Sequence, residues 1–84
     1  MFYVYVLKEM ERESFYIGST SDLRKRVAEH NQGKNQSTRN RQWQLVYYEA
    51  YLTEPGARQR EHQLKHHGKA KQALMQRIKS SLPN

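Results

Sequence analysis

One glutamate lies on a helix face that should be buried, which makes it the first candidate for chemistry. At about 100° per residue, Ala57, Glu61 and Leu64 fall on one stripe of a helix expected over residues 57–67. A carboxylate buried without a partner costs several kcal/mol, so Glu61 needs a cationic partner, hydrogen bonds or a metal ion. The pattern leaves a buried Glu–Arg pair and a metal ligand as equal alternatives.

Arg26 and His30 form a second group of chemically active side chains, four residues apart on the flank of an earlier helix. Leu23 and Val27 define the apolar stripe of that helix, and the flank beside it points toward the edge of a sheet. An exposed ion pair between Arg26 and Asp22, with His30 capping the helix end, is the ordinary explanation. Taken alone, the spacing favours that explanation over a site.

Two further histidines, His62 and His66, have the i and i+4 spacing that can bind zinc. On the helix wheel they lie roughly opposite the stripe of Glu61 and Leu64, toward solvent, where a third ligand is hard to find. We therefore do not expect zinc there.

Three runs rich in aromatic and β-branched residues predict the strands that position these groups, namely residues 2–7, 14–18 and 43–51. Helices are expected at residues 22–31, 57–67 and 70–78, after a chain break at Pro55 and Gly56 and with an exposed basic loop at residues 33–42. The first two strands are too close in sequence for a parallel crossover, so they should form an antiparallel hairpin. The predicted fold is of the α/β class in its α+β form: a small three-stranded antiparallel sheet flanked by helices, in the order β-β-α-β-α-α.

The composition predicts one domain with an anionic partner. The chain has 84 residues, with 15 lysines and arginines against 8 acidic residues and no cysteine. Such a length supports a single core, which we place at residues 1–79, followed by a frayed tail at residues 80–84. The net charge of +7 favours nucleic acid over a membrane, because no stretch combines a lysine-rich face with a broad apolar one. Without a signal peptide, a membrane span or cysteines, the expected location is cytoplasmic.

Several short motifs, none of them specific alone, occur in an order and at spacings that resemble the GIY-YIG nuclease superfamily. They are Tyr3-Val4-Tyr5, Phe15-Tyr16-Ile17-Gly18, the segment Ser19-Thr20-Ser21-Asp22-Leu23 leading to Arg26 and His30, and Ala57-x-x-Arg60-Glu61-x-x-Leu64-Lys65. The resemblance covers Tyr3 to about Ile78 and is strongest to the short stand-alone bacterial members, the UPF0213-like proteins. Tyr3 and Val4 replace the glycine and isoleucine of the first triplet, whereas its tyrosine is kept as Tyr5.

The resemblance implies metal-dependent hydrolysis of a phosphodiester bond in DNA, by an endonuclease or a nuclease of DNA repair or recombination. It assigns catalytic roles to Tyr5, Tyr16, Arg26 and His30, and makes Glu61 the ligand of one Mg²⁺ or Mn²⁺ ion. One tyrosine would help to deprotonate the attacking water, and Arg26 would bind the scissile phosphate. The alternative is a catalytically inactive nucleic-acid-binding domain, an outcome that Tyr3 in place of glycine allows.

Substrate binding is expected from basic residues around the first helix and the following loop, namely Arg24, Lys25, Lys34, Arg39 and Arg41. Such side chains contact phosphates and carry no sequence information. DNA is therefore the expected partner, recognised by its shape or ends, while RNA and a protein partner for targeting stay open.

The hairpin makes a geometric prediction about the site. For both phenols to act on one phosphate, Tyr5 and Tyr16 should lie on one face of the sheet, in paired or diagonal positions. Side chains alternate along a strand, so a slip of the register by one residue would put Tyr16 on the opposite face. With Arg26 and a partly buried Glu61, the two tyrosines should line one concave surface.

Overall fold

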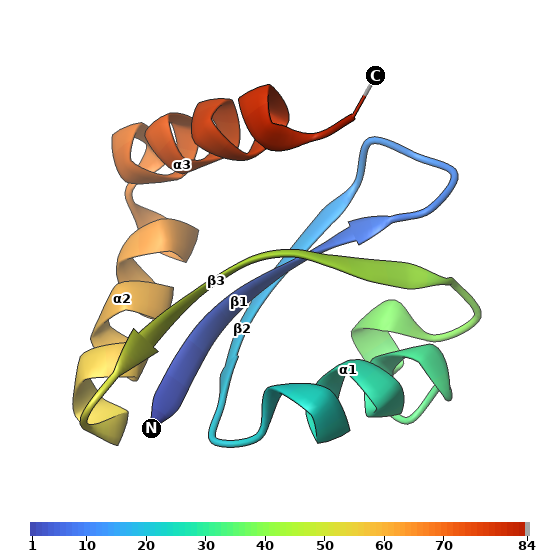
Figure 1. Ribbon diagram of the computed structural model, residues 1–84, viewed down its shortest axis with the longest axis horizontal. Coiled ribbons are helices and arrows are strands. Elements are labelled where there is room, and N and C mark those ends of the chain that lie inside the picture. The colour runs from blue at the N-terminus through green and yellow to red at the C-terminus, as the bar shows by residue number, and fades with distance from the viewer. Residues whose placement is uncertain (84) are drawn as a thin grey trace.

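The fold is a three-stranded antiparallel sheet with helices on both faces, in the predicted order (Figure 1). The computed structural model describes residues 1–83, except for the side chain of Ser37. The elements are β1 (Phe2–Glu9), β2 (Phe15–Thr20), α1 (Leu23–Asn31), the 3₁₀ helix η1 (Gln36–Thr38), β3 (Trp43–Tyr51), α2 (Glu54–His66) and α3 (Gly68–Ser81). The strand order is β2-β1-β3, so β1 is central and β2 is an edge strand.

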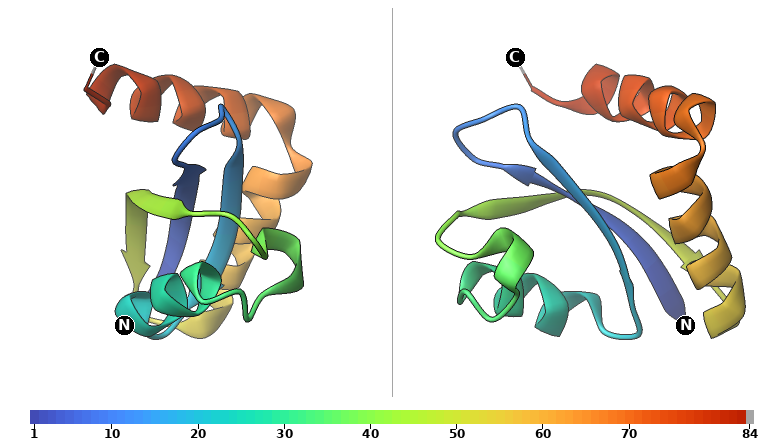
Figure 2. Two further views of the ribbon diagram at one scale, coloured as in Figure 1. Left: turned by 90° about the vertical axis from the view of Figure 1, so that its right-hand side faces the viewer. Right: turned by 180° about the vertical axis from the view of Figure 1, so that it is seen from behind.

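The central strand buries both of its faces, because two hydrophobic layers meet on it. Val4 and Val6 point into a cluster with residues of α2 and α3, whereas Tyr5 and Leu7 point into a cluster with Trp43. Figure 2 shows the sheet between α1 on one side and α2 and α3 on the other. None of the helices in residues 1–83 is long and apolar enough to cross a membrane.

The register between β1 and β2 decides where the tyrosines point. Tyr5 pairs with Gly18, and Leu7 pairs with Tyr16, so all four side-chain positions share one face. Tyr5 and Tyr16 therefore occupy diagonal positions on that face, as predicted.

All three helices begin at other residues than predicted: α3 begins at Gly68 instead of residue 70, and the starts of α1 and α2 differ because of capping. Asp22 lies outside α1 as its N-cap, and its carboxylate accepts a hydrogen bond from the backbone N–H of Lys25 at 3.1 Å. Helix α2 begins at Glu54, with Thr53 as its cap, so Pro55 and Gly56 are helical and the predicted chain break is wrong. Proline is tolerated in a first helical turn, where its missing N–H would have no helical partner.

Two other segments are more ordered than predicted. The loop at residues 33–42 contains η1, and Thr38 at the end of η1 is fully buried, so the loop is not exposed throughout. Helix α3 runs to Ser81, which makes the first two residues of the predicted frayed tail helical; Asn84 lies outside the described residues.

Candidate active site

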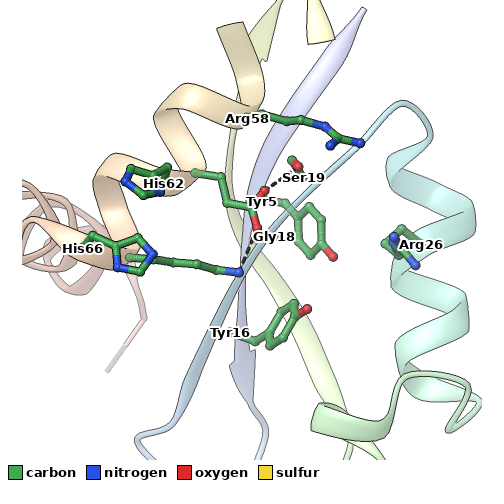
Figure 3. Close-up of a pocket in the computed structure, with 10 residues that line it drawn as sticks. Tyr5, Tyr16, Gly18, Ser19, Arg26, Arg58, His62 and His66 are labelled. Carbon is green, nitrogen blue, oxygen red and sulfur yellow. Dashed lines mark hydrogen bonds and ion pairs between the residues drawn. The ribbon is translucent and has the colours of Figure 1, made fainter. Parts of the chain in front are cut away.

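A cavity of about 480 Å³ opens between α1 and α2, along the edge strand β2 (Figure 3). It is lined by four predicted site residues, Tyr5, Tyr16, Arg26 and Glu61. The rings of both tyrosines are directed toward Arg26 across the cavity. The predicted concave surface is therefore present in the structure.

A buried chain of hydrogen bonds lies behind the first tyrosine. The Tyr5 hydroxyl is 2.8 Å from Nε2 of His30, and Nδ1 of His30 is 2.7 Å from the Thr38 hydroxyl. All three residues have less than 2% of their surface exposed. His30 therefore does not cap α1, and it lies beneath the cavity wall instead of at the cavity surface.

The neutral tautomer of His30 with a proton on Nδ1 fits its hydrogen-bond partners. In this tautomer Nδ1–H donates to the Thr38 hydroxyl at 2.7 Å, and that hydroxyl can donate its single proton to the carbonyl of Asn35 at 3.4 Å. Burial, followed by the charge of Arg26, lowers the pKa of His30, which favours the neutral imidazole. Nε2 then carries a lone pair and accepts the hydrogen bond from the Tyr5 hydroxyl.

Tyr5 itself is a protonated phenol. Burial, followed by the neighbouring Tyr16, raises its pKa above the ordinary value, and Arg26 opposes this only in part. Tyr5 can therefore take a proton from a reactant only if it passes its own proton to His30.

Gly18 is required by the close approach of the Tyr5 ring. A Cβ atom at position 18 would lie 2.5 Å from the Tyr5 hydroxyl oxygen and 2.7 Å from the ring carbon that bears it. Any side chain at this position would displace Tyr5 from the cavity. This contact gives a physical reason for glycine in the segment Tyr16-Ile17-Gly18.

Tyr16 covers His30 from the cavity side. Its ring centroid lies 4.8 Å from that of His30 and 6.3 Å from that of Tyr5, and the Lys65 ammonium lies 5.8 Å from its centre. Tyr16 is only half-buried, in contrast to Tyr5. The structure thus brings both tyrosines and His30 together, with Tyr16 as the more accessible phenol.

Glu61 reaches the cavity from α2. Its Oε1 accepts a hydrogen bond from the Ser19 hydroxyl at 2.5 Å, and its Oε2 accepts one from Lys65 at 2.8 Å. Burial raises the pKa of this carboxyl, but the hydrogen bonds from Lys65 and Ser19 more than offset it, and the net pKa is lowered. Glu61 is therefore an ionised, partly buried carboxylate, and its partners are Lys65 and Ser19 instead of an arginine.

Arg26 is half-exposed at the cavity wall and pairs with Glu29 at 3.5 Å. The ion pair with Asp22 that the sequence suggested for Arg26 is not formed, because the Asp22 carboxylate caps α1. The Arg26 guanidinium is thus held by one neighbour on its own helix and remains accessible to an anion in the cavity.

The two histidines of α2 are exposed, as the helix wheel predicted, but they lie closer to Glu61 than the wheel suggested. His62 and His66 both line the cavity that contains Glu61, and their ring centroids are 4.3 Å apart. Glu61 lies at the margin of the buried stripe of α2, so His62 and His66, which are next to it on the helix surface, also face the cavity.

Besides the predicted Arg26, the cavity contains two basic residues that were not among the site residues predicted from the sequence. The predicted set of Arg24, Lys25, Lys34, Arg39 and Arg41 is exposed, but none of these residues lines the cavity. Arg58 and Lys65 line it, three residues before and four residues after Glu61. Residues at these spacings share one face of a helix, so the sequence already indicated that Arg58 and Lys65 lie beside Glu61.

Tyr3, the departure from the motif, lies outside the cavity lining. Its ring packs edge-on against Tyr48, with centroids 5.9 Å apart. The added bulk therefore does not fill the site.

Glu61 is the acidic residue that lines the cavity, so a cation held there would keep most of its water. Within residues 1–83, no three His, Cys, Asp or Glu side chains are grouped so that they could hold a metal ion. Glu61 nevertheless offers an ionised carboxylate, and Mg²⁺ is commonly held by one or two carboxylates together with waters and substrate phosphate.

The chain is similar in sequence and in fold to several known proteins. A UPF0213 protein of Haloquadratum walsbyi is 42% identical over 71 residues, which cover 82% of this chain and 79% of that protein. A UPF0213 protein of Bacillus pumilus is 43% identical over 65 residues, covering 75% and 65% of the two chains. The solution NMR structure of a UPF0213 protein from Bacillus halodurans matches with a TM-score of 0.57 at 31% identity, over 96% of this chain and 88% of that one. The family model of the GIY-YIG catalytic domain matches residues 1–76, and the chain belongs to this family.

Proposed function

We propose that the protein hydrolyses phosphodiester bonds of DNA as a divalent-metal-dependent endonuclease, with the cavity between α1 and α2 as its active site. Membership of the GIY-YIG family implies nuclease activity in general. The observation that supports the specific proposal is the juxtaposition of Tyr5, bonded to a neutral buried His30, with Arg26 and the ionised Glu61 at one cavity.

The proton from the attacking water follows the buried hydrogen bonds. As the water attacks phosphorus, its proton moves to the Tyr5 oxygen and the Tyr5 proton moves to Nε2 of His30. Thr38 positions His30 by accepting its Nδ1–H, which keeps Nε2 free to receive that proton. This relay explains how a phenol with a raised pKa can act without forming a free phenolate.

Cationic side chains stabilise the charge that develops on the phosphoryl oxygens. Arg26 lies on one side of the cavity and Arg58 and Lys65 on the other, so a phosphate between them meets positive charge on both sides. Tyr16, the more accessible phenol, would donate a proton to the departing alkoxide.

Glu61 would hold one Mg²⁺ or Mn²⁺ ion. When bound, the ion supplies additional positive charge for the phosphoryl oxygens. Each oxygen of Glu61 accepts one hydrogen bond, from Ser19 or from Lys65, and keeps a second acceptor position for the ion.

DNA contact outside the cavity is assigned to the exposed basic residues of α1 and the following loop. The logarithm of affinity should fall linearly with the logarithm of salt concentration, because each neutralised phosphate releases counterions. Replacing Lys34, Arg39 and Arg41 together with alanine should flatten this slope, and an unchanged slope would remove the loop from the DNA-binding surface.

A cleavage screen tests the proposal against its alternative, an inactive nucleic-acid-binding domain. Supercoiled plasmid and duplex, branched, nicked and single-stranded oligonucleotides would be incubated with Mg²⁺, Mn²⁺ or EDTA, with RNA oligonucleotides as a further arm. We expect cleavage of DNA with either metal and none with EDTA. Binding to these substrates without cleavage of any of them would establish the inactive alternative.

A further inference from the structure

Ser19 lies where the two sides of the active-site cavity meet. It pairs with Val4, whose side chain belongs to the cluster beneath α2 and α3, so Ser19 faces α2. The preceding residue, Gly18, pairs with Tyr5 and faces α1. Because β2 is an edge strand, both faces of the sheet open at its free edge, and the cavity is lined by residues of both.

Consecutive residues of β2 contact the two groups on which the proposed reaction depends. Gly18 leaves room for the Tyr5 ring, because a Cβ atom there would lie 2.5 Å from the Tyr5 hydroxyl oxygen. The hydroxyl of Ser19 donates to Oε1 of Glu61 at 2.5 Å, as the dashed line at Ser19 in Figure 3 marks. One short segment of backbone therefore sets the position of the Glu61 carboxylate relative to the Tyr5 phenol.

The second hydrogen bond of Glu61 does not set this position. Lys65 lies four residues further along the same helix, and its ammonium donates to Oε2 at 2.8 Å. The Lys65 side chain is 42% exposed, and exposed pairs at this spacing hold their partners only weakly. Within residues 1–83, Ser19 is the hydrogen-bond partner that joins Glu61 to an element other than its own helix.

A serine hydroxyl suits a carboxylate that also binds a cation. The hydroxyl has one proton to donate and two lone pairs. When it donates to Oε1 of Glu61, it occupies one acceptor position of the carboxylate and leaves others for the cation. Its own lone pairs can accept hydrogen bonds from water that the cation holds. Partners of this kind orient metal ligands, and their loss typically lowers metal affinity by about tenfold to a hundredfold.

We propose that Ser19 is a positioning residue, which orients the Glu61 carboxylate toward a divalent cation in the cavity. Because Ser19 follows Gly18 directly, it also keeps that carboxylate at a fixed distance from Tyr5. The inference rests on the proposed function, since it requires Glu61 to hold the ion. Metal binding is measured without cleavage, so the role of Ser19 and the proposed activity can fail separately.

Titration of the DNA-free, ¹⁵N-labelled protein with Mn²⁺ tests the inference. Mn²⁺ is paramagnetic and broadens the NMR signals of nearby groups, so the backbone amide signals of Gly18 and Glu61 would be followed. We expect Ser19→Ala to need about tenfold more Mn²⁺ than the wild type for the same broadening. Ser19→Thr keeps the hydroxyl and should bind Mn²⁺ within about twofold of the wild type. Ser21→Ala removes the hydroxyl of an exposed serine outside the cavity lining and should change nothing.

Two outcomes separate the role of Ser19 from the proposed metal site. Equal Mn²⁺ affinity of Ser19→Ala and the wild type would overturn the positioning role and leave the proposed function standing. Equal broadening in the wild type and in Glu61→Gln, or no broadening in either, would show that Glu61 does not hold the ion and would overturn both. If Ser19→Ala does not fold, Ser19→Cys, whose thiol is a weak donor, takes its place and should show the same loss of affinity.

Discussion

Helix α2 presents two adjacent charged residues, Arg60 and Glu61, to two different polar clusters. Arg60 donates two hydrogen bonds to Glu49 of β3, at 2.9 and 3.1 Å, in the group we call the Glu49 cluster. Tyr47 and Tyr51 donate one further hydrogen bond each to the same carboxylate. Glu61 opens on the cavity and receives hydrogen bonds from Ser19 and Lys65. The two glutamates therefore differ in how fully their oxygens are used.

The number of occupied acceptor positions distinguishes a structural carboxylate from one that is available to a ligand. A carboxylate has about four acceptor positions, and Glu49 has four donors, whereas Glu61 has two among the described residues. Burial raises the pKa of Glu49, but hydrogen bonds from Arg60, Tyr51 and Tyr47 lower it further than burial raises it. Burial and then Glu49 raise the pKa of Tyr51 to about 12, so this partner stays a donor. The Glu49 cluster is complete, and Glu61 retains positions for a cation and its waters.

Glu61→Gln should have the largest effect on activity. We expect metal-dependent cleavage to fall by at least about a hundredfold, because the variant loses the charge that holds the ion. DNA affinity and the free energy of unfolding should change little, since Ser19 and Lys65 are accessible to water from the cavity. Plasmid nicking, measured beside DNA binding and urea unfolding, checks this. Cleavage at the wild-type rate would remove Glu61 from the site.

Glu49→Gln should show the opposite pattern. We expect the free energy of unfolding to fall by about 2 kcal/mol, because Arg60 loses its ionic partner in a largely buried cluster. The folded variant should cleave within about twofold of the wild type. The matched control is Glu54→Gln, which breaks an exposed ion pair with Arg58. It should lower the free energy of unfolding by less than about 1 kcal/mol. Equal losses of stability in both variants would show that the Glu49 cluster has no special role.

Thr38→Val tests the positioning of His30 and should have an intermediate effect. The variant keeps the shape of the side chain but removes the acceptor for Nδ1–H of His30. We expect cleavage to fall about tenfold, within the range that a single proton-transfer group contributes. Imidazole ¹⁵N shifts should show a changed tautomer, and Thr38→Ser, which keeps the hydroxyl, should restore both readouts. Unchanged shifts in the valine variant would argue against the assigned tautomer.

The pH dependence of stability should show the smallest effect, and its sign follows from His30. Because burial and Arg26 lower the pKa of His30 in the folded protein, the unfolded chain takes up a proton first as the pH falls below about 6.5. Stability should therefore decrease on acidification from 6.5 toward the lower folded pKa. Urea unfolding at several pH values would show this slope in the wild type and in a His66→Gln control, but not in His30→Gln. A wild-type stability that rises over this range would contradict the assignment of a neutral His30.

The strands were predictable because they depend on short-range patterns. The third strand has the bounds that its aromatic and β-branched run predicted. The shared face of Tyr5 and Tyr16 was predicted from the chemistry that both would perform, and the register that the structure shows fulfils it. Glu61 was found because a charged residue on an apolar stripe needs an explanation. The structure confirmed the order of the elements, whereas family membership leaves the roles of individual residues as proposals.

The missing parts of the site depend on contacts between distant segments. A wheel of α1 alone placed His30 at a helix flank, but only the folded chain shows that Tyr5 and Thr38 enclose it. Thr38 lies in a polar loop without apolar periodicity, so nothing local marked it as buried. The Glu–Arg pair considered for Glu61 exists in the structure, but it joins Glu49 and Arg60 across two elements.

The relay through Tyr5 is the central claim, and Tyr5→Phe tests it most directly. The substitution removes one hydroxyl, keeps the ring above Gly18 and leaves Glu61, Arg26 and the basic surface unchanged. Metal-dependent plasmid nicking would be compared with the wild type at equal DNA occupancy, after unfolding measurements show that the variant is folded. The relay predicts a loss of about a hundredfold or more in cleavage rate with unchanged DNA affinity. Wild-type cleavage by the phenylalanine variant would show that Tyr5 is a packing residue and that the water loses its proton by another route.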